Sequence, residues 1–149
     1  MRNNWYENVY TLLLNAEDAL VAQYYPLSGS FIDVTEYTHF AFLIGLGALD
    51  SALTPQVFQD TSATETGSIK VITGAAETIL DTDDDDTFLI EVETARLDIA
   101  NDFRYVTLSM VGAAGGNDYG AVWFFGWNAR RTVTQETTFS SGNHTLVAG

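Results

Sequence analysis

Carboxylates are the most numerous groups in this sequence that could do chemistry, and they are densest between residues 81 and 86. Oxygen ligands of this kind are the ones that calcium prefers. An EF-hand loop that began at Asp81 would place Asp86 where glycine belongs and Val92 where the bidentate glutamate belongs. The EF-hand pattern therefore fails, and a solvated turn is the simpler interpretation, with calcium binding as the alternative. The carboxylates of this loop are Asp81, Asp83, Asp84, Asp85 and Asp86.

A second pair of carboxylates, Glu91 and Glu93, is separated by a single residue. In a strand these side chains point to the same face, and two carboxylates flanking one bond are the machinery of glycosidases. Carboxylates that face outward on an acidic protein are the commoner explanation. An acidic hydrolase that depends on Glu91 is kept only as a remote hypothesis.

Other catalytic and metal-binding patterns are missing from the sequence. The two histidines, His39 and His144, lie far apart and in no His-x-x-x-His spacing. The chain has no cysteine and no Gly-x-Ser-x-Gly nucleophile elbow. The glycine-rich stretch at residues 112–118, GAAGGND, lacks the Gly-Lys-Ser/Thr ending of a phosphate-binding loop and fits a tight turn. We therefore expect no enzyme, no cofactor, and no catalytic or metal-ligating residues.

Charge also limits the partners of the chain. Six basic residues against twenty acidic ones give a net charge of −14. Such a surface repels the phosphates of nucleic acids and of anionic membranes. No run of about 18 apolar residues indicates a membrane span, and the N-terminus has no signal-peptide pattern. We expect no nucleic-acid partner and no membrane partner.

The elements that position these residues are predicted to be strands. Short runs with a period of two, bounded by Gly, Asn, Asp and Ser, favour an all-β protein, an antiparallel β-sandwich that is jelly-roll-like and has an N-terminal arm. We expect one domain, with the arm and first strand in residues 1–28 and the sandwich in residues 29–149. Residues 17–25 fit either two helical turns or an extended arm that ends at Pro26. The expected strands are residues 9–14, 31–37, 39–49, 56–61, 69–73, 88–93, 96–99, 103–111 and 119–127.

The last of these strands, AVWFFGW, is apolar on both faces. Trp123, Phe125 and Trp127 share one face, whereas Val122 and Phe124 share the other. One sandwich core buries only one face, so the second needs a cover. Three covers are open: the Trp5–Tyr6 arm of the same chain, a neighbouring subunit, or a sugar stacked on the indoles. The predicted interface residues are Trp5, Tyr6, Tyr10, Trp123, Phe125 and Trp127.

Two stretches between residues 31 and 111 resemble a known family. The first has the form V-x-Q-x-T…G…K-x-I-T-G-A, and the second has the form E-V…L-D…F-R-Y-V. They are similar to small structural proteins of tailed bacteriophages, of the head decoration (cement) type. The matching residues are Val57, Gln59, Thr61, Gly67, Lys70, Ile72, Thr73, Gly74 and Ala75, then Glu91, Val92, Leu97, Asp98, Phe103, Arg104, Tyr105 and Val106.

This resemblance implies a virion protein on the outside of the capsid, assembled in the host cytoplasm, which binds and stabilises the phage head. Its implied partners are the major capsid protein and its own copies, as a dimer or trimer. We expect the lattice contacts in residues 1–10 and 132–149, because chain termini can become ordered on binding. The alternative is a carbohydrate-binding or tail-fibre or baseplate β-sandwich module, with Trp123 or Trp127 as the sugar platform.

Overall fold

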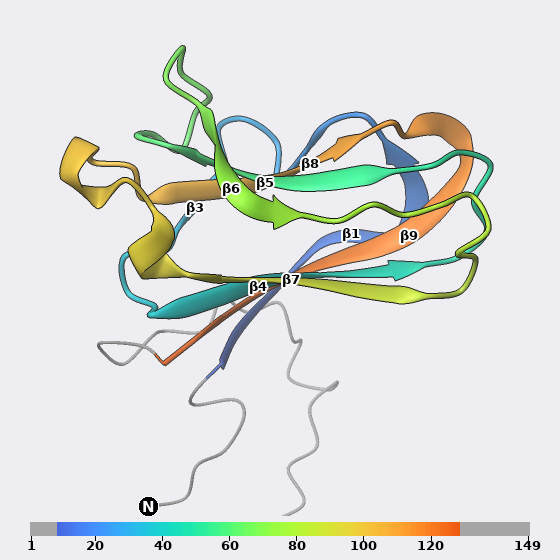
Figure 1. The fold of residues 1–149 in the computed structure, drawn as a ribbon, viewed down its shortest axis with the longest axis horizontal. Coiled ribbons are helices and arrows are strands. Elements are labelled where there is room, and N and C mark those ends of the chain that lie inside the picture. Colours follow the sequence, from blue (N-terminus) through green and yellow to red (C-terminus); the bar gives the residue numbers. More distant parts are fainter. Residues whose placement is uncertain (1–8, 129–149) are drawn as a thin grey trace, which may run out of the picture.

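The fold consists of two antiparallel sheets packed as a sandwich (Figure 1). The structure is a computed structural model, and it describes residues 9–128, apart from the side chains of residues 17, 18 and 114–116. The strands are β1 (Val9–Val21), β2 (Tyr24–Tyr25), β3 (Ile32–Asp33), β4 (His39–Leu46), β5 (Thr54–Asp60), β6 (Lys70–Ala76), β7 (Thr87–Glu93), β8 (Tyr105–Val111) and β9 (Ala114–Trp127). Two single-turn 3₁₀ helices, η1 (Thr94–Arg96) and η2 (Ile99–Asn101), lie between β7 and β8.

The strand order identifies the type of sandwich. Sheet A has the order β1-β9-β4-β7, and sheet B has the order β2-β8-β5-β6, with the short β3 also paired to β8. If β3 is left out and the other eight strands are renumbered along the chain, these orders become 1-8-3-6 and 2-7-4-5. This is the arrangement of a jelly roll. The predicted all-β, jelly-roll-like sandwich is confirmed.

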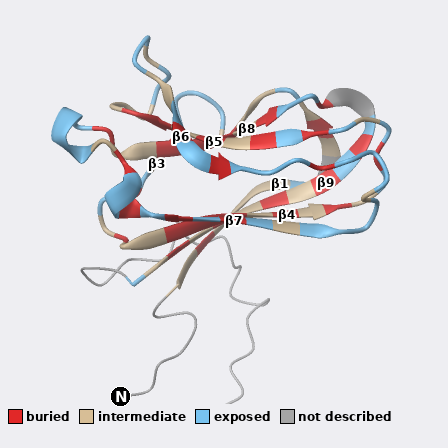
Figure 2. Cartoon of the chain, viewed as in Figure 1, coloured by how far each residue is buried: buried red, intermediate tan, exposed pale blue. Residues whose placement is uncertain are grey.

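The core lies between the two sheets and is almost entirely apolar (Figure 2). Strands β4 and β9 form the centre of sheet A, and their inward side chains are the aromatic part of the core. Phe124 packs against Phe40 and Phe42, with ring centroids 6.0 and 5.4 Å away. Sheet B contributes Val57, Val106, Leu108 and Met110, all fully buried. These residues alternate with outward-facing ones, as the period of two requires.

Several local predictions are corrected by long-range pairing. Residues 17–25 are extended, since β1 runs to Val21 and pairs with β9 along its length. The N-terminal segment, residues 1–28, therefore contributes two strands to the sandwich from its described part. The turn predicted at residues 112–118 is mostly strand, because β9 already begins at Ala114 opposite Val21. Within residues 31–37, only Ile32–Asp33 forms a strand.

The prediction of a strand at residues 96–99 is wrong. The chain there forms η1 and η2, with Leu97 buried between them. The Ile99 side chain is 55% exposed. Asp102 ends η2 in the left-handed region with φ of 61°, a conformation that aspartate tolerates better than most residues. No helix among residues 9–128 is long and apolar enough to cross a membrane.

Candidate functional site

The residues singled out in the last strand meet on the outer face of sheet A. Strand β9 places Trp123, Phe125 and Trp127 directly opposite Leu43, Ala41 and His39 of β4. On its other side the same three residues pair with Leu13, Thr11 and Val9 of β1. Because the intervening residues Val122 and Phe124 are fully buried in the core, this whole set points away from it. The predicted split of the strand into two apolar faces matches the structure.

Phe125 and Trp127 border an apolar groove of about 450 Å³, whereas Trp123, on the same face, is not one of its lining residues. The groove crosses all four strands of sheet A, from Val9 at one edge to Leu89 and Glu91 at the other. Ala41 forms its floor and is buried, whereas Leu43 and Trp127 are half-buried on its sides. Glu91 is the only lining residue with a charged side chain. We call this surface the sheet A groove, lined by Val9, Ala41, Leu43, Leu89, Glu91, Phe125 and Trp127.

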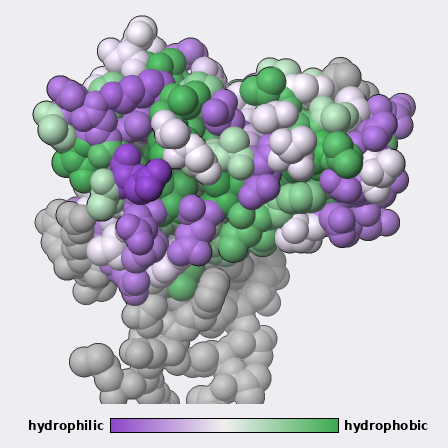
Figure 3. All heavy atoms as spheres, in the orientation of Figure 1, coloured by the Kyte–Doolittle hydropathy of each residue, from purple (hydrophilic) through white to green (hydrophobic). Residues whose placement is uncertain are grey.

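The apolar character of this groove is unusual for the outside of a sandwich. An antiparallel sheet commonly packs one face on the core and presents polar side chains on the other. Leu89 does not follow this pattern, since it is an apolar residue that is 52% exposed on the edge strand β7. Elsewhere on the surface, Figure 3 shows hydrophilic residues gathered towards both ends of the sandwich, with hydrophobic residues between them. Contiguous exposed apolar surface, such as that of the sheet A groove, marks interaction sites.

His39 supports the end of this face. Its imidazole stacks on the Trp127 indole, with centroids 5.8 Å apart and planes inclined by 13°. The Nδ1 atom lies 3.0 Å from the Thr38 hydroxyl, and Nε2 lies 3.9 Å from a Glu93 carboxylate oxygen. The ring is therefore held by its neighbours on both sides and positions Trp127. The other histidine, His144, is outside the described residues.

Tyr10 does not lie on this surface. It sits opposite Gly126 and turns inward, with its ring 5.8 Å from Tyr37 and 6.2 Å from Phe124. The Tyr37 ring packs directly over Gly126, where a Cβ would approach it to 2.8 Å. Burial raises the pKa of Tyr37, so that this phenol stays neutral. The predicted residues Trp5 and Tyr6 lie outside the described residues.

The aspartate-rich loop at residues 81–86 has structural hydrogen bonds. Asp84 accepts one from the Leu49 amide at 2.8 Å, and Asp83 accepts one from the Leu80 amide at 2.8 Å. Asp85 takes a positive φ of 62°, as turn residues do. Within residues 9–128, no three acidic or histidine side chains cluster in a way that could hold a metal ion. Two of the five carboxylates of this loop, Asp83 and Asp84, thus accept hydrogen bonds from backbone amides.

Glu91 and Glu93 both point outward from β7, as predicted. Besides its place in the sheet A groove, Glu91 borders a second cleft of about 320 Å³ between the edge strands β6 and β7, together with Glu93 and Arg96. The Arg96 guanidinium donates a hydrogen bond to the Thr73 carbonyl across this cleft. The two carboxylates are exposed, and the cleft between these edge strands is open to solvent.

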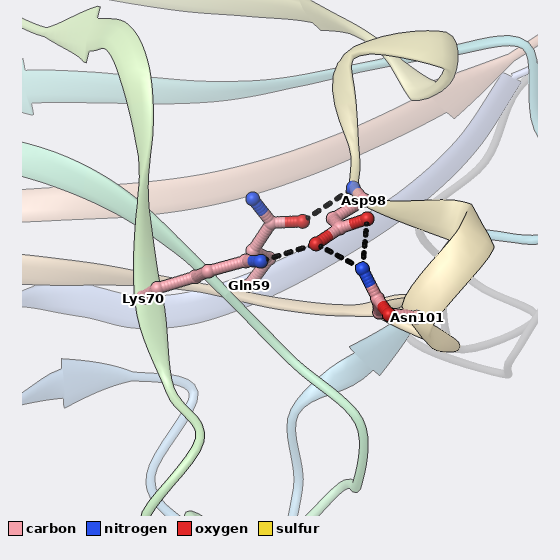
Figure 4. A network of polar contacts seen from close by, with 4 residues as sticks. All are labelled: Gln59, Lys70, Asp98 and Asn101. Atoms are coloured by element: carbon pink, nitrogen blue, oxygen red, sulfur yellow. Dashed lines mark hydrogen bonds and ion pairs between the residues drawn. The ribbon is translucent and has the colours of Figure 1, made fainter.

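Sequence reasoning missed the polar contacts that hold η1 and η2 to sheet B (Figure 4). The Lys70 ammonium donates to Asp98, and it also lies 3.9 Å from the centroid of the Phe103 ring. Asp98 accepts two further bonds from the Asn101 amide, and its own N–H donates to Gln59. The hydrogen bond from Lys70 is the main reason that the pKa of Asp98 is lowered. Lys70 and Asp98 lie 28 positions apart, and no local pattern signals the pair.

Five of the groove residues were not predicted as interface residues: Val9, Ala41, Leu43, Leu89 and Glu91. One signal for Leu89 was present: it is an apolar residue in the outward row that Glu91 and Glu93 continue.

Comparison of the chain with protein-family models, with curated proteins and with solved structures gave no match.

Proposed function

We propose that this chain is a virion structural protein, a capsid decoration (cement) protein that binds the outside of a phage head and stabilises it. The observation that carries the proposal is the sheet A groove, an apolar surface that spans the width of a sheet. The resemblance of residues 31–111 to head decoration proteins supports the same function. The groove is the surface with which the protein would bind the major capsid protein, alone or together with other copies of itself.

The proposed action is thermodynamic. Each square ångström of apolar surface removed from water contributes roughly 25 cal/mol. The docked groove therefore favours the assembled shell over separate subunits. A molecule that binds only the assembled state stabilises that state by mass action, by about 2.7 kcal/mol at a free concentration of 100 Kd. Many copies on one shell would multiply this effect.

The composition of the groove favours a protein partner over a sugar. Carbohydrate recognition needs hydrogen-bonding groups beside the aromatic platform, because sugar hydroxyls lose water when they bind. The only lining side chains with polar atoms are Glu91 and Trp127, whose indole has a single N–H donor. One face of the Trp127 indole is already covered by His39. The glycan-binding alternative is tested by screening the wild type and Trp127→Ala on a glycan array, where binding that the substitution abolishes would favour it.

The decisive experiment adds purified protein to phage shells assembled without it. We expect it to cosediment with the shells and to raise the temperature at which they disassemble. Leu89→Asp places a charge at the exposed rim of the groove and should lower binding at least tenfold. The matched control is Val71→Asp, since Val71 is also an outward residue of an edge strand, 42% exposed, but on sheet B. Circular dichroism establishes that both variants fold.

Two results would contradict the proposal. One is that the wild-type protein does not bind shells that lack it and leaves their stability unchanged. The other is that Leu89→Asp and Val71→Asp bind as well as the wild type, which would remove the groove as the contact surface.

A further inference from the structure

We propose that the segment of shell protein that docks in the sheet A groove carries a lysine or arginine beside its apolar side chains, and that this cation lies against Glu91 and Glu93. This inference rests on the proposed function, because it specifies the chemistry of the partner at the same surface. The occupant is thus an apolar segment of the capsid protein with at least one basic residue at the β7 end.

The first step is the position of Glu91. It lines the groove where the groove reaches the edge strand β7, and Glu93 is the next outward residue along that strand. A partner that covers Leu43 and Leu89 would also remove water from the Glu91 carboxylate. Burial of an unpaired carboxylate is costly, and the cost is relieved only by an opposite charge or by hydrogen bonds. An occupant without a cation would leave that cost uncompensated.

The second step is that the described part of the chain offers no cation to Glu91. Its three basic residues are engaged elsewhere. Lys70 pairs with Asp98, and Arg104 lies 3.5 Å from Asp33. Arg96 borders the second cleft, which Glu91 and Glu93 also line, but its guanidinium donates its hydrogen bond to the Thr73 carbonyl. Among residues 9–128, Glu93 has only His39 as an ion-pair neighbour, at 3.9 Å, and its side chain is 66% exposed.

The third step is the negative charge of the whole surface. Of the twenty acidic residues, only Glu7 and Glu136 lie outside residues 9–128, whereas three of the six basic residues do (Arg2, Arg130 and Arg131). Residues 9–128 therefore have a larger excess of acidic over basic residues than the whole chain. A second copy that docked groove to groove would bring two acidic rims together, and like charges at an interface are unfavourable. A basic partner would instead be attracted from a distance.

The test uses the shell-binding assay with a double variant, Glu91→Gln with Glu93→Gln. Both changes keep the shape of the side chains and remove their charge. The control is Glu77→Gln with Asp81→Asn, which removes the same charge from exposed positions in the segment that follows β6. At about 50 mM salt we expect the groove variant to bind roughly tenfold more weakly than the wild type, and its affinity to fall less steeply with salt. The control should behave as the wild type.

Zero-length carbodiimide cross-linking of the bound protein gives a second readout. Mass spectrometry should find amide links from Glu91 or Glu93 to lysines of the shell protein. If the wild type binds shells but the groove variant keeps its affinity and salt dependence, the inference is overturned while the proposed function stands. If the wild type does not bind shells at all, the proposed function fails first.

Other occupants of the groove are distinct outcomes of the same experiments. A wild-type dimer in sedimentation that Leu89→Asp dissociates would place a second copy in the groove and overturn the inference. Loss of the effect of Glu91→Gln in a background of Arg130→Gln and Arg131→Gln would mean that the chain supplies its own cations. That result would also overturn it.

Discussion

The two sheets of the sandwich share one core but differ in their outer faces. On sheet A the outward residues of the central strands are Leu43, Trp123, Phe125 and Trp127. On sheet B the corresponding rows contain Gln56 opposite Ser109 and Phe58 opposite Thr107. The aromatic residues of sheet B form a local cluster, because Tyr24 covers Phe58 at 5.9 Å and Phe31 at 5.5 Å. Sheet B thus packs these outer aromatic side chains against one another, whereas sheet A presents a groove.

This difference shows which apolar residues serve folding and which are available for binding. A half-polar outer face, as on sheet B, is what an antiparallel sheet needs for solubility. The aromatic outer face of sheet A is not required by the core, since Phe40, Phe42 and Phe124 already fill it. The following predictions test whether the two faces of sheet A have separate roles.

The largest expected effect compares adjacent phenylalanines on opposite faces of β9. Phe124→Ala should destabilise the protein by about 3–5 kcal/mol, because Phe124 is fully buried among four aromatic neighbours. Phe125→Ala removes the same atoms from the half-buried outer face and should cost about 1–2 kcal/mol. Urea unfolding of both variants gives the two values. Equal losses would mean that the outer face belongs to the core, and the comparison would break down.

Two glycines allow the inner and outer faces of sheet A to be compared again, by adding one methyl group at each position. Gly126 faces the core, and a Cβ there would lie 2.8 Å from the Tyr37 ring, so Gly126→Ala should cost about 1–3 kcal/mol. Gly45 lies on the outer face of β4, where a Cβ meets nothing within 4 Å. Gly45→Ala should therefore be neutral or stabilise by about 0.5–1 kcal/mol. Thermal unfolding of the two variants measures the difference, and a destabilising Gly45→Ala would show that the outer face is already packed.

Much of this division could be predicted from the sequence, because strand alternation is strict. The pattern AVWFFGW assigned Phe124 and Phe125 to opposite faces without any knowledge of the partner strands. Tyr10 was placed among the interface residues as part of the N-terminal arm, residues 1–10. The structure puts it inside, opposite Gly126 and against the rings of Tyr37 and Phe124. This position depends on pairing with a strand more than one hundred positions away.

Other features could not be predicted, because they depend on pairing between distant segments. The glycines before Asn117 favour a turn locally, but β1 is long enough to keep β9 paired back to Ala114. The extent of the sheet A groove depends on four strands from four separate parts of the chain. The resemblance to head decoration proteins suggested a function, but its motif residues lie mostly on sheet B and between η1 and η2, and only Glu91 among them lines the groove.

Sheet B is expected to be the more acid-sensitive of the two sheets. At its end, the buried Asp60 accepts hydrogen bonds from the Thr61 and Thr66 amides and from the Thr66 hydroxyl. Burial alone would raise the pKa of Asp60, but these bonds outweigh it and lower the pKa. A carboxyl with a lowered pKa in the folded state contributes stability above its unfolded pKa of about 4. That contribution is lost as the pH falls through the lower, folded value.

Amide hydrogen exchange measures this sensitivity. The Thr61 and Thr66 amides should lose protection below about pH 4, before the amides of β4 and β9 do. Asp60→Asn, which replaces an accepting oxygen with a donor, should remove about 1–3 kcal/mol at neutral pH and flatten the acid dependence. Equal loss of protection in both sheets would contradict the expected difference between them.

The smallest expected effect comes from a substitution that gives part of the outer face of sheet A the polar character of sheet B. Leu89→Thr replaces an exposed apolar residue of β7 with a β-branched polar one, which strands accept well. Because Leu89 is 52% exposed on an edge strand, the free energy of unfolding should change by no more than about 0.5 kcal/mol. Shell binding should nevertheless fall, since the rim of the groove loses its apolar contact. A variant as stable as the wild type that binds less well would separate the surface used for binding from the surface used for folding, whereas a loss of stability in step with binding would join them.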